Sequence, residues 1–436
     1  MNGTGAMRLS AIEEFFYFDD RPAYPCSCKV RADFSGEIDF TGMESALRVT
    51  VQRYPRFCSA VTGEPPVWLP PGEDTKLQIL TGEFPPDCLD LANGRGLAVR
   101  VFRSEAGPAL EFLFHHACSD GIGFFNFLSE FLVAYGVACG SRQIAEPHRQ
   151  LRASVRGQRP PGWRVACCVW ALLLEWRTFL NKPAALVPNA PLAEDHRDTR
   201  TELTHFFSIA ESASLRRAAR QSGVSCNDLL TRDALVAIKE WSTQCVGDSR
   251  DPILRVVIPS GTRRSPTSFD SRANAVSLLF LDRKESSISE SPSFLRGLSR
   301  EIMRKRRLGS DDAFLFLLEV ARLLPGGIRK HALAKKCLAS VVVSNLGRVL
   351  RSCHLPRDSG RILVGNATLE TISASGPLRP FQSVGFWFFN YANRWSVTMG
   401  YDPRVVSIEG ANRIIKALVA RVGDDRGQGF EASRQR

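Results

Sequence analysis

The sequence predicts an α/β protein built from two similar lobes. Its 436 residues exceed the size at which one hydrophobic core stops growing, about 300 residues, so two packed units are expected. Strand-like and helix-like patterns alternate in both halves, and a stretch rich in Arg, Pro and Gln at 141–162 separates them. No repeat is visible between the halves, so their similarity is inferred from this pattern alone. We expect an N-terminal lobe at 1–185 and a C-terminal lobe at 186–436.

Composition and charge limit the classes of function. Hydrophobic residues make up 44% of the chain and charged residues 23%, which is typical of a soluble globular protein. The net charge of +12 suits an anionic partner, such as the phosphates of coenzyme A, an acidic carrier protein, an anionic lipid or a nucleic acid. Neither zinc-finger spacing nor a helix-turn-helix pattern is found, so nucleic acid is not expected as a partner.

The cysteines indicate a reducing compartment. Twelve of them are scattered along the chain without the density of a disulfide framework, so free thiols are expected. The pair Cys26 and Cys28 has no matching second pair, and we predict no metal site. The first residues lack the apolar core of a signal peptide. We therefore expect a cytoplasmic protein.

The first lobe opens with a helix and a hairpin. Thr41 and Glu44 have the spacing of a capping box, and the helix they begin ends before Pro55. Strands are predicted at 97–102 and 110–116, on either side of a Gly-Pro turn. Directly after the second strand the pattern becomes helical, with a stripe of Phe, Leu and Tyr.

The segment 163–180 allows two interpretations. Its uninterrupted apolar run is too short to span a bilayer. Three tryptophans and basic flanks would suit a helix that lies on a membrane surface. A buried helix that crosses between the lobes is the other interpretation, and the one we favour. Membrane contact would be peripheral.

The second lobe repeats the alternation of strands and helices. Gly and Pro residues occur where the predicted helices and strands of this lobe end. The pattern predicts strands at 204–209, 254–259, 274–281, 339–344, 385–390 and 395–401, and helices at 211–222, 227–241, 287–308, 311–335 and 407–421.

The residues that indicate chemistry are His115-His116-Ala-Cys-Ser-Asp120-Gly121. Four fixed residues at this spacing would occur by chance in a chain of this length on the order of once in a thousand. They sit where a strand passes into a helix, so one side chain can be held rigidly and still face a cleft. Adjacent residues of a strand point to opposite faces, so at most one of the two histidines faces that cleft.

We choose His116 as the general base. A histidine at the N-terminus of a helix is disfavoured as the charged imidazolium, so its neutral ring can accept a proton. It could deprotonate a hydroxyl or an amine that attacks a thioester carbonyl. The alternative is that both histidines are satisfied core groups.

With these residues the sequence resembles the condensation domains of nonribosomal peptide synthetases. It is also similar to their free-standing relatives, the alcohol acetyltransferases, polyketide-associated acyltransferases and wax-ester synthases. The similarity is specific at 115–121 and fainter elsewhere, at 89–102, 227–228, 257–263, 274 and 343–347. The Asp-Phe-Gly-Trp-Gly motif of plant acyltransferases is absent. The lipid-type relatives therefore look nearer.

The resemblance implies a fold and a set of roles. The fold is that of chloramphenicol acetyltransferase, with two lobes, each a mixed sheet with helices, forming a pseudo-dimer around a central tunnel. His116 would be the catalytic base and His115 structural. Asp120 would point away from the substrate and pair with Arg263, while Gly121 would supply a tight backbone turn.

Three further residues, Ser344, Asn345 and Gly347, are candidates for the wall of the tunnel. A plain turn at the end of a strand is the alternative for them. Asn227 and Asp228 are interpreted as a helix cap rather than as a site.

The function that follows is an acyltransferase of lipid or secondary metabolism. It would move an acyl group from acyl-coenzyme A or a carrier-bound acyl-phosphopantetheine to a small-molecule or lipid alcohol or amine. No bound cofactor is implied, a carrier protein is a candidate partner, and the resemblance implies a monomer. Two alternatives remain: a non-catalytic binding or scaffold protein of the same fold, and a thioester hydrolase that uses water as the acceptor. The acyl chain length and the acceptor are left open.

Overall fold

The computed structural model describes most of both halves of the chain. The described residues are 6–72, 77–85, 88–104, 107–140, 166, 169–170, 172–173, 175–186, 201–245, 251–262 and 274–422.

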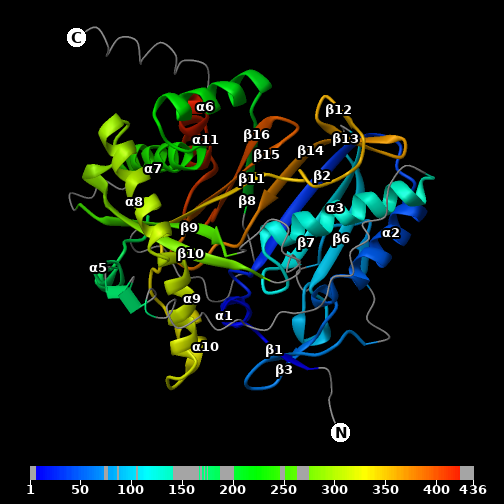
Figure 1. Cartoon of the computed structure of the whole chain (residues 1–436), viewed down its shortest axis with the longest axis horizontal. Coiled ribbons are helices and arrows are strands. Elements are labelled where there is room, and N and C mark those ends of the chain that lie inside the picture. Colours follow the sequence, from blue (N-terminus) through cyan, green and yellow to red (C-terminus); the bar gives the residue numbers. More distant parts are fainter. Residues whose placement is uncertain are drawn as a thin grey trace.

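The first of two large sheets has seven strands. Strand β2 (Ser27–Gly36) pairs antiparallel with β7 (Gly107–His115), which pairs antiparallel with β6 (Leu97–Ser104). The sheet runs in the order β12-β13-β14-β2-β7-β6-β5. The bounds of its other strands are β5 (Gln78–Leu80), β12 (Arg357–Asp358), β13 (Arg361–Val364) and β14 (Ala367–Ser375). Helices α2 (Phe40–Gln52) and α3 (Gly121–Ala138) pack together beside this sheet (Figure 1).

The second sheet has six strands in the order β10-β9-β11-β15-β16-β8. Its members are β8 (Thr201–Phe206), β9 (Ile253–Gly261), β10 (Val276–Lys284), β11 (Val341–Arg348), β15 (Val384–Tyr391) and β16 (Arg394–Tyr401). Figure 1 shows its helices gathered on the opposite side of the molecule from α2 and α3. They are α6 (Ile209–Gln221), α7 (Cys226–Cys245), α8 (Pro292–Arg307) and α11 (Ile408–Val422).

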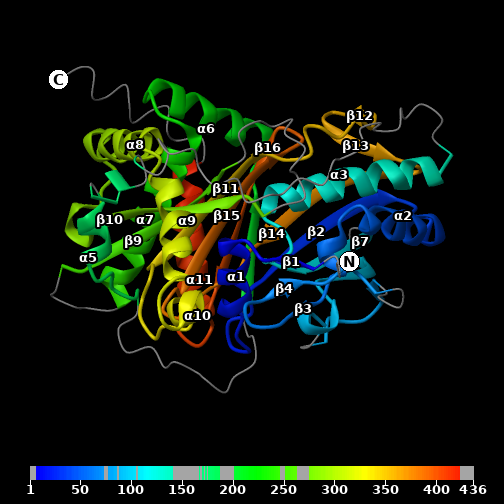
Figure 2. The same ribbon diagram turned by 60° about the horizontal axis from the view of Figure 1, so that its bottom comes forward.

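Between the two sheets stand three helices: α1 (Ala11–Asp19), α9 (Ser310–Ala321) and α10 (Gly327–Ala332). Helix α1 contacts both α9 and α10, so the two halves of the chain meet here (Figure 2). Each large sheet has its own cluster of buried apolar side chains. The predicted α/β fold of two lobes, each a mixed sheet with helices, is confirmed.

Small elements complete the structure. A sheet of three short strands is formed by β1 (Met7–Arg8), β3 (Val61–Thr62) and β4 (Val67–Trp68). Single 3₁₀ turns lie at η1 (Pro55–Phe57), η2 (Leu91–Asn93) and η3 (Glu285–Ser287). The short helix α5 (Trp176–Leu180) lies against β10.

The sheets do not follow the predicted division of the chain at residues 185 and 186. Strands β12, β13 and β14 come from the C-terminal half but belong to the seven-stranded sheet, where β14 pairs with β2. Without β14 one side of β2 would expose unpaired backbone groups. The partners are more than 330 residues apart along the chain, as in Ser35 opposite Thr368, and a local pattern carries no information about such a pairing.

Several predicted elements are confirmed and two are wrong. The hairpin of β6 and β7 and the helix that follows it are present. The capping box at Thr41 is absent, because Asp39 is the N-cap of α2 and its side chain accepts a hydrogen bond from the Thr41 amide. The single helix predicted at 311–335 is two helices, α9 and α10. Gly326, which has a left-handed backbone (φ 83°), lies between them.

Helix α3 is the core helix of the first lobe. By length and composition it is apolar enough to cross a membrane, but 61% of it is buried inside the protein. Its phenylalanines pack against each other and against the sheet; the rings of Phe114 and Phe124 stack with centroids 4.3 Å apart. Burial on nearly every side explains a helix that is apolar all round.

The segment 163–180 is not buried where it is described. The side chains of Val169, Trp170, Leu173, Trp176 and Leu180 are all exposed. Glu175 is the buried residue here, and it is bound by Lys305 and by Ser310. The favoured interpretation of a buried crossover helix is therefore wrong for these residues. One charged residue anchors the segment to α8 and α9, and the apolar side chains face outward.

Candidate active site

The backbone of His116 is held by both halves of the chain. His116 directly follows β7, and its amide donates a hydrogen bond to the carbonyl oxygen of Cys26, 2.8 Å away. Its carbonyl oxygen accepts a hydrogen bond from Nδ2 of Asn274 at 2.6 Å. Asn274 precedes β10 of the second sheet and is buried. Two short contacts from different elements thus fix the position of this residue.

The ring of His116 lies in the wall of a cavity and is half-buried. It stacks on the ring of Phe16 from α1, with centroids 4.0 Å apart and planes inclined by 18°. Burial lowers the pKa of His116 below its ordinary value of 6.5, while the charge of the nearby Asp120 acts in the opposite direction. The ring is therefore neutral at pH 7 and able to accept a proton.

His115 takes the opposite direction and does not line the cavity. Its Nδ1 accepts a hydrogen bond from the Ala117 amide at 3.1 Å, so the proton of the neutral ring is on Nε2. That nitrogen lies 3.5 Å from Oδ2 of Asp20. Asp20 also accepts a hydrogen bond from the amide of Cys26 at 2.7 Å. His115 thus connects the corner of the motif to the residue that follows α1.

Asp120 connects the motif to the second half of the chain. One carboxylate oxygen accepts a hydrogen bond from the Gly123 amide at 2.8 Å and caps α3. The other accepts from the amide of Ala275 at 2.7 Å. Arg263, which the resemblance pairs with Asp120, lies outside the described residues, so that pairing stays a prediction. The described bonds of this buried carboxylate are to backbone amides.

Gly121 packs closely against the second half of the chain. Its backbone does not have a left-handed conformation. A methyl group at this position would lie 2.8 Å from Cδ2 of Leu346, a residue of β11. Since Leu346 belongs to the second sheet, Gly121 is a point of close approach between the two halves beside the motif. The tight turn that the resemblance implies stays a prediction.

The cavity has a volume of about 460 Å³ and is formed by both lobes. This is within the size of pockets that enclose small molecules. Most of its wall is apolar, contributed by α1, β2, β7, α3, β9, β10 and α9. Representative residues are Phe16, Val30, Phe124, Val257, Leu278 and Phe314. Polar and charged side chains are fewer, and they include His116, Asp120, His331, Lys336 and Arg379.

Two of the three predicted wall residues line the cavity. Ser344 and Asn345 do so, and Gly347 does not. All three belong to β11, which pairs in parallel with β15 and has an irregular register after Asn345. The Oδ1 of Asn345 accepts a hydrogen bond from the Gly347 amide at 2.8 Å, and Gly347 has φ 66°. This segment is a bulged strand and not a turn at the end of one.

Three residues at the site were not found by reasoning from the sequence. Cys26 holds His116 through a backbone carbonyl, for which no side-chain signal exists. Phe16 belongs to an apolar run that is typical of any core helix. Asn274 was predicted to begin a strand and was noted in the resemblance, but no role was predicted for it, and its bond to His116 spans 158 residues of chain. Among the described residues no group of three His, Cys, Asp or Glu side chains could hold a metal ion.

The described cysteines are free thiols. They are Cys26, Cys28, Cys58, Cys88, Cys118, Cys139, Cys226, Cys337 and Cys353. Burial raises the pKa of the Cys118 thiol within the motif, so at pH 7 it is not the reactive thiolate.

Comparison with known proteins shows which fold the chain has. No protein-family model matches it. An uncharacterized protein of Mycobacterium tuberculosis (strain ATCC 25618 / H37Rv), Rv2305, is 24% identical over 379 residues, which cover 79% of this chain and 84% of that protein.

Solved structures of condensation domains are similar over nearly the whole chain. The first condensation domain of the CDA synthetase superimposes with a TM-score of 0.70 at 14% identity, covering 97% of each chain. The epimerization domain from the third module of tyrocidine synthetase B gives a TM-score of 0.65 at 15% identity, over 96% of each chain. For polyketide synthase associated protein 5 from Mycobacterium tuberculosis the TM-score is 0.63 at 14% identity, over 96% of this chain and 98% of that one. The chain therefore has the two-lobed, chloramphenicol-acetyltransferase-like fold of condensation domains.

Proposed function

We propose that this protein is an acyltransferase that moves an acyl group from a thioester to an alcohol or an amine, with His116 as the general base. The observation that carries the proposal is the position of this imidazole. It lies in the wall of a cavity between two lobes, with its backbone fixed by Cys26 and Asn274 and its pKa lowered by partial removal from water. A neutral and rigidly held ring beside an enclosed space is what a general base requires.

The reaction can be written with this chain's own groups. The acceptor hydroxyl or amine gives its proton to a nitrogen of His116 as its oxygen or nitrogen bonds to the thioester carbonyl carbon. The tetrahedral intermediate then collapses, the carbon–sulfur bond breaks, and the departing thiolate takes the proton from His116. The first turn of α3, where Gly121 and Ile122 line the cavity, places partial positive charge beside the developing oxyanion.

The donor and acceptor follow from the same proposal. The thioester is acyl-coenzyme A or an acyl group on the phosphopantetheine arm of a carrier protein, which would then be a partner. The acceptor is a small molecule or a lipid, in keeping with the apolar wall of the cavity. We propose that the protein acts as a cytoplasmic monomer with no resident cofactor. Contact with a membrane through 163–180 stays a prediction.

A panel of acyl-coenzyme A and carrier-bound donors, with pooled alcohols and amines, tests the activity. Release of free thiol is measured for the wild type and for His116→Ala. We expect release that depends on the acceptor and falls by about 10² to 10⁴ in the variant. His354→Ala is the matched control, because His354 is exposed and does not line the cavity. Thermal unfolding establishes that both variants are folded.

Three outcomes would contradict the proposal. Release without any acceptor would indicate a hydrolase. Equal release by His116→Ala would exclude this residue as the base. A folded wild type that is inactive with every donor would favour a binding or scaffold protein.

A further inference from the structure

The tip formed by the end of α9 and by α10 is apolar and exposed. We call the segment 320–338 the α9–α10 tip. Its side chains Val320, Leu323, Leu324 and Leu333 are exposed, and Leu323, at 85%, is more exposed than any other large apolar residue described. In Figure 1 the tip projects from the lower edge of the protein, away from the bodies of both sheets. Exposed leucines at a projecting turn cost free energy unless something covers them.

The cavity reaches the surface at this tip, as it also does beside Ile122 and Gly261. Val320 and Leu324 are exposed and at the same time line the cavity. Deeper in α9, Phe314, Leu317 and Leu318 continue the apolar wall toward the interior. An apolar molecule can therefore pass from the tip to the cavity along apolar side chains. An isolated patch of exposed leucines would not be connected to the cavity by a row of apolar side chains.

The charge of the α9–α10 tip indicates which kind of surface binds it. Its 19 residues contain five Arg or Lys and no Asp or Glu. Arg322 is paired with Glu14 and Glu319 at 2.8 and 3.0 Å, and Arg329 with Glu64 at 3.2 Å. Lys330 and Lys336 are exposed as well and add positive charge beyond these pairs. Leucines ringed by lysines suit a surface that is negative outside and apolar within, as an anionic bilayer is.

We propose that the α9–α10 tip docks on an anionic membrane surface. Leu323 and Leu324 enter the apolar boundary of the bilayer, and Lys330 and Lys336 face the lipid phosphates. The mouth of the cavity then opens directly onto the lipid phase. Delivery of an apolar substrate through this mouth rests on the proposed function, but docking itself does not.

An acidic carrier protein is the competing occupant, since it would also meet the lysines. A carrier would have to present an apolar patch complementary to Leu323, which is 85% exposed. A bilayer accepts an apolar side chain at about the free energy of its removal from water. The observations therefore favour the membrane.

Flotation of the full-length protein with vesicles tests the docking. One set of vesicles is phosphatidylcholine alone, and the other contains phosphatidylglycerol as the anionic lipid. We expect wild type to float mainly with the anionic vesicles and to be released by salt. Leu323→Glu with Leu324→Glu, and separately Lys330→Glu with Lys336→Glu, should each weaken binding by about tenfold or more.

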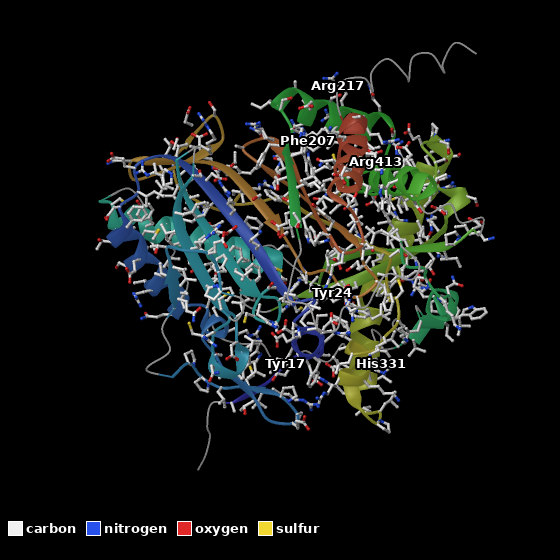
Figure 3. The ribbon with its side chains drawn as sticks, turned by 180° about the vertical axis from the view of Figure 1, so that it is seen from behind. Tyr17, Tyr24, Phe207, Arg217, His331 and Arg413 are labelled. Carbon is white, nitrogen blue, oxygen red and sulfur yellow. The ribbon has the colours of Figure 1, made fainter. Side chains whose placement is uncertain are left out.

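The controls make the same chemical changes on α6. Ile209→Glu replaces an exposed apolar residue, and Arg217→Glu with Arg220→Glu reverses two exposed charges. Figure 3 shows Arg217 and His331, a residue of α10, at opposite ends of the molecule. These variants should bind as wild type does. Leu323→Glu alone, which does not alter a residue that lines the cavity, covers the case that the double leucine variant does not fold.

Several results would overturn the docking. Wild type that fails to float with anionic vesicles would do so, and so would an equal loss in the α6 controls. If a purified acyl carrier protein binds the wild type through the tip lysines while vesicles do not, the surface is for a protein partner. None of these readouts requires turnover. A failed acyltransferase assay and a failed docking assay are therefore distinguishable.

Discussion

The inner end of the cavity and its mouth are held in different ways. At the inner end Asp120 and Asn274 are buried and His116 is half-buried, and hydrogen bonds of 2.6 to 2.8 Å fix them to elements from both halves of the chain. At the mouth Leu323 and Lys336 are exposed, and the segment that carries them is a pair of short helices joined through two glycines.

The difference reflects two tasks. A base must stay within a few tenths of an ångström of its reacting atom, and buried hydrogen bonds between packed elements provide that precision. A docking surface needs only the correct polarity and charge. Changes at the inner end should therefore alter turnover and folding together, whereas changes at the mouth should alter binding to a surface.

The largest effect after removal of His116 itself is expected for Asn274→Ala. The change removes the only described side chain that donates to the His116 carbonyl and leaves that oxygen buried without this donor. Misplacement of the ring should lower kcat by about tenfold to a hundredfold with little change in KM. Stability should fall by about 1–3 kcal/mol. Steady-state kinetics and thermal unfolding measure the two effects.

The matched control is Asn412→Ala. Nδ2 of Asn412 also donates to a backbone carbonyl, that of Ile408 at 2.9 Å, but on the exposed face of α11. It should change neither kcat nor stability appreciably. If Asn274→Ala lowered only the melting temperature, its bond would join the two halves without positioning the base.

A smaller effect, on stability, is expected for Gly121→Ala. The new methyl group would lie 2.8 Å from Leu346 Cδ2, so the Leu346 side chain would have to move away from α3. A loss of about 1–3 kcal/mol is expected, and Leu346→Val in the same chain should restore part of it. Chemical denaturation of the single and double variants measures the coupling.

Gly297→Ala is the control for this change. Gly297 lies within α8, and nothing lies within 4 Å of the position of a Cβ there. Replacement should leave stability unchanged or raise it by about 0.5–1 kcal/mol. A similar loss at both glycines would show that Leu346 is not the cause.

The smallest expected effect is on the pH dependence of kcat/KM, which reports the ionisation of His116 at the inner end of the cavity. Because burial lowers the pKa of His116 below 6.5, kcat/KM should stay constant from pH 8 down to about 6.5 and fall only at lower pH. Phe16→Ala, which opens the stacked face of the ring to water, should move this fall to higher pH. A wild-type profile that already declines above pH 7 would contradict a neutral base.

The same pKa predicts how stability responds to acid. The unfolded chain binds a proton at His116 more readily than the native protein does, so the native state loses stability as the pH falls below 6.5. His116→Gln should reduce this slope. Melting temperatures of both proteins across the acid range provide the measurement.

Sequence patterns predicted the elements that depend on neighbours in the chain. The hairpin of β6 and β7, the start of α3 and the position of the motif at a strand-to-helix corner follow from turn residues and periodicity over short distances. The capping box at Thr41 failed because Asp39, two residues earlier, was an equally good cap. Local sequence rules predict the presence of a helix more reliably than they predict the residue at which it begins.

By itself the sequence determined the fold class and the motif that presents His116, because these depend on local geometry and on residue types. The tertiary structure alone decided that β14 joins the first sheet, that Asn274 holds the carbonyl of His116, and that Leu346 packs against Gly121. It also decided that Val320 and Leu324 lie at the mouth of a cavity. Each of these is a contact between segments far apart in the chain. Only the folded arrangement of the two sheets brings such segments together, and a local sequence pattern carries no information about which distant segment a residue will contact.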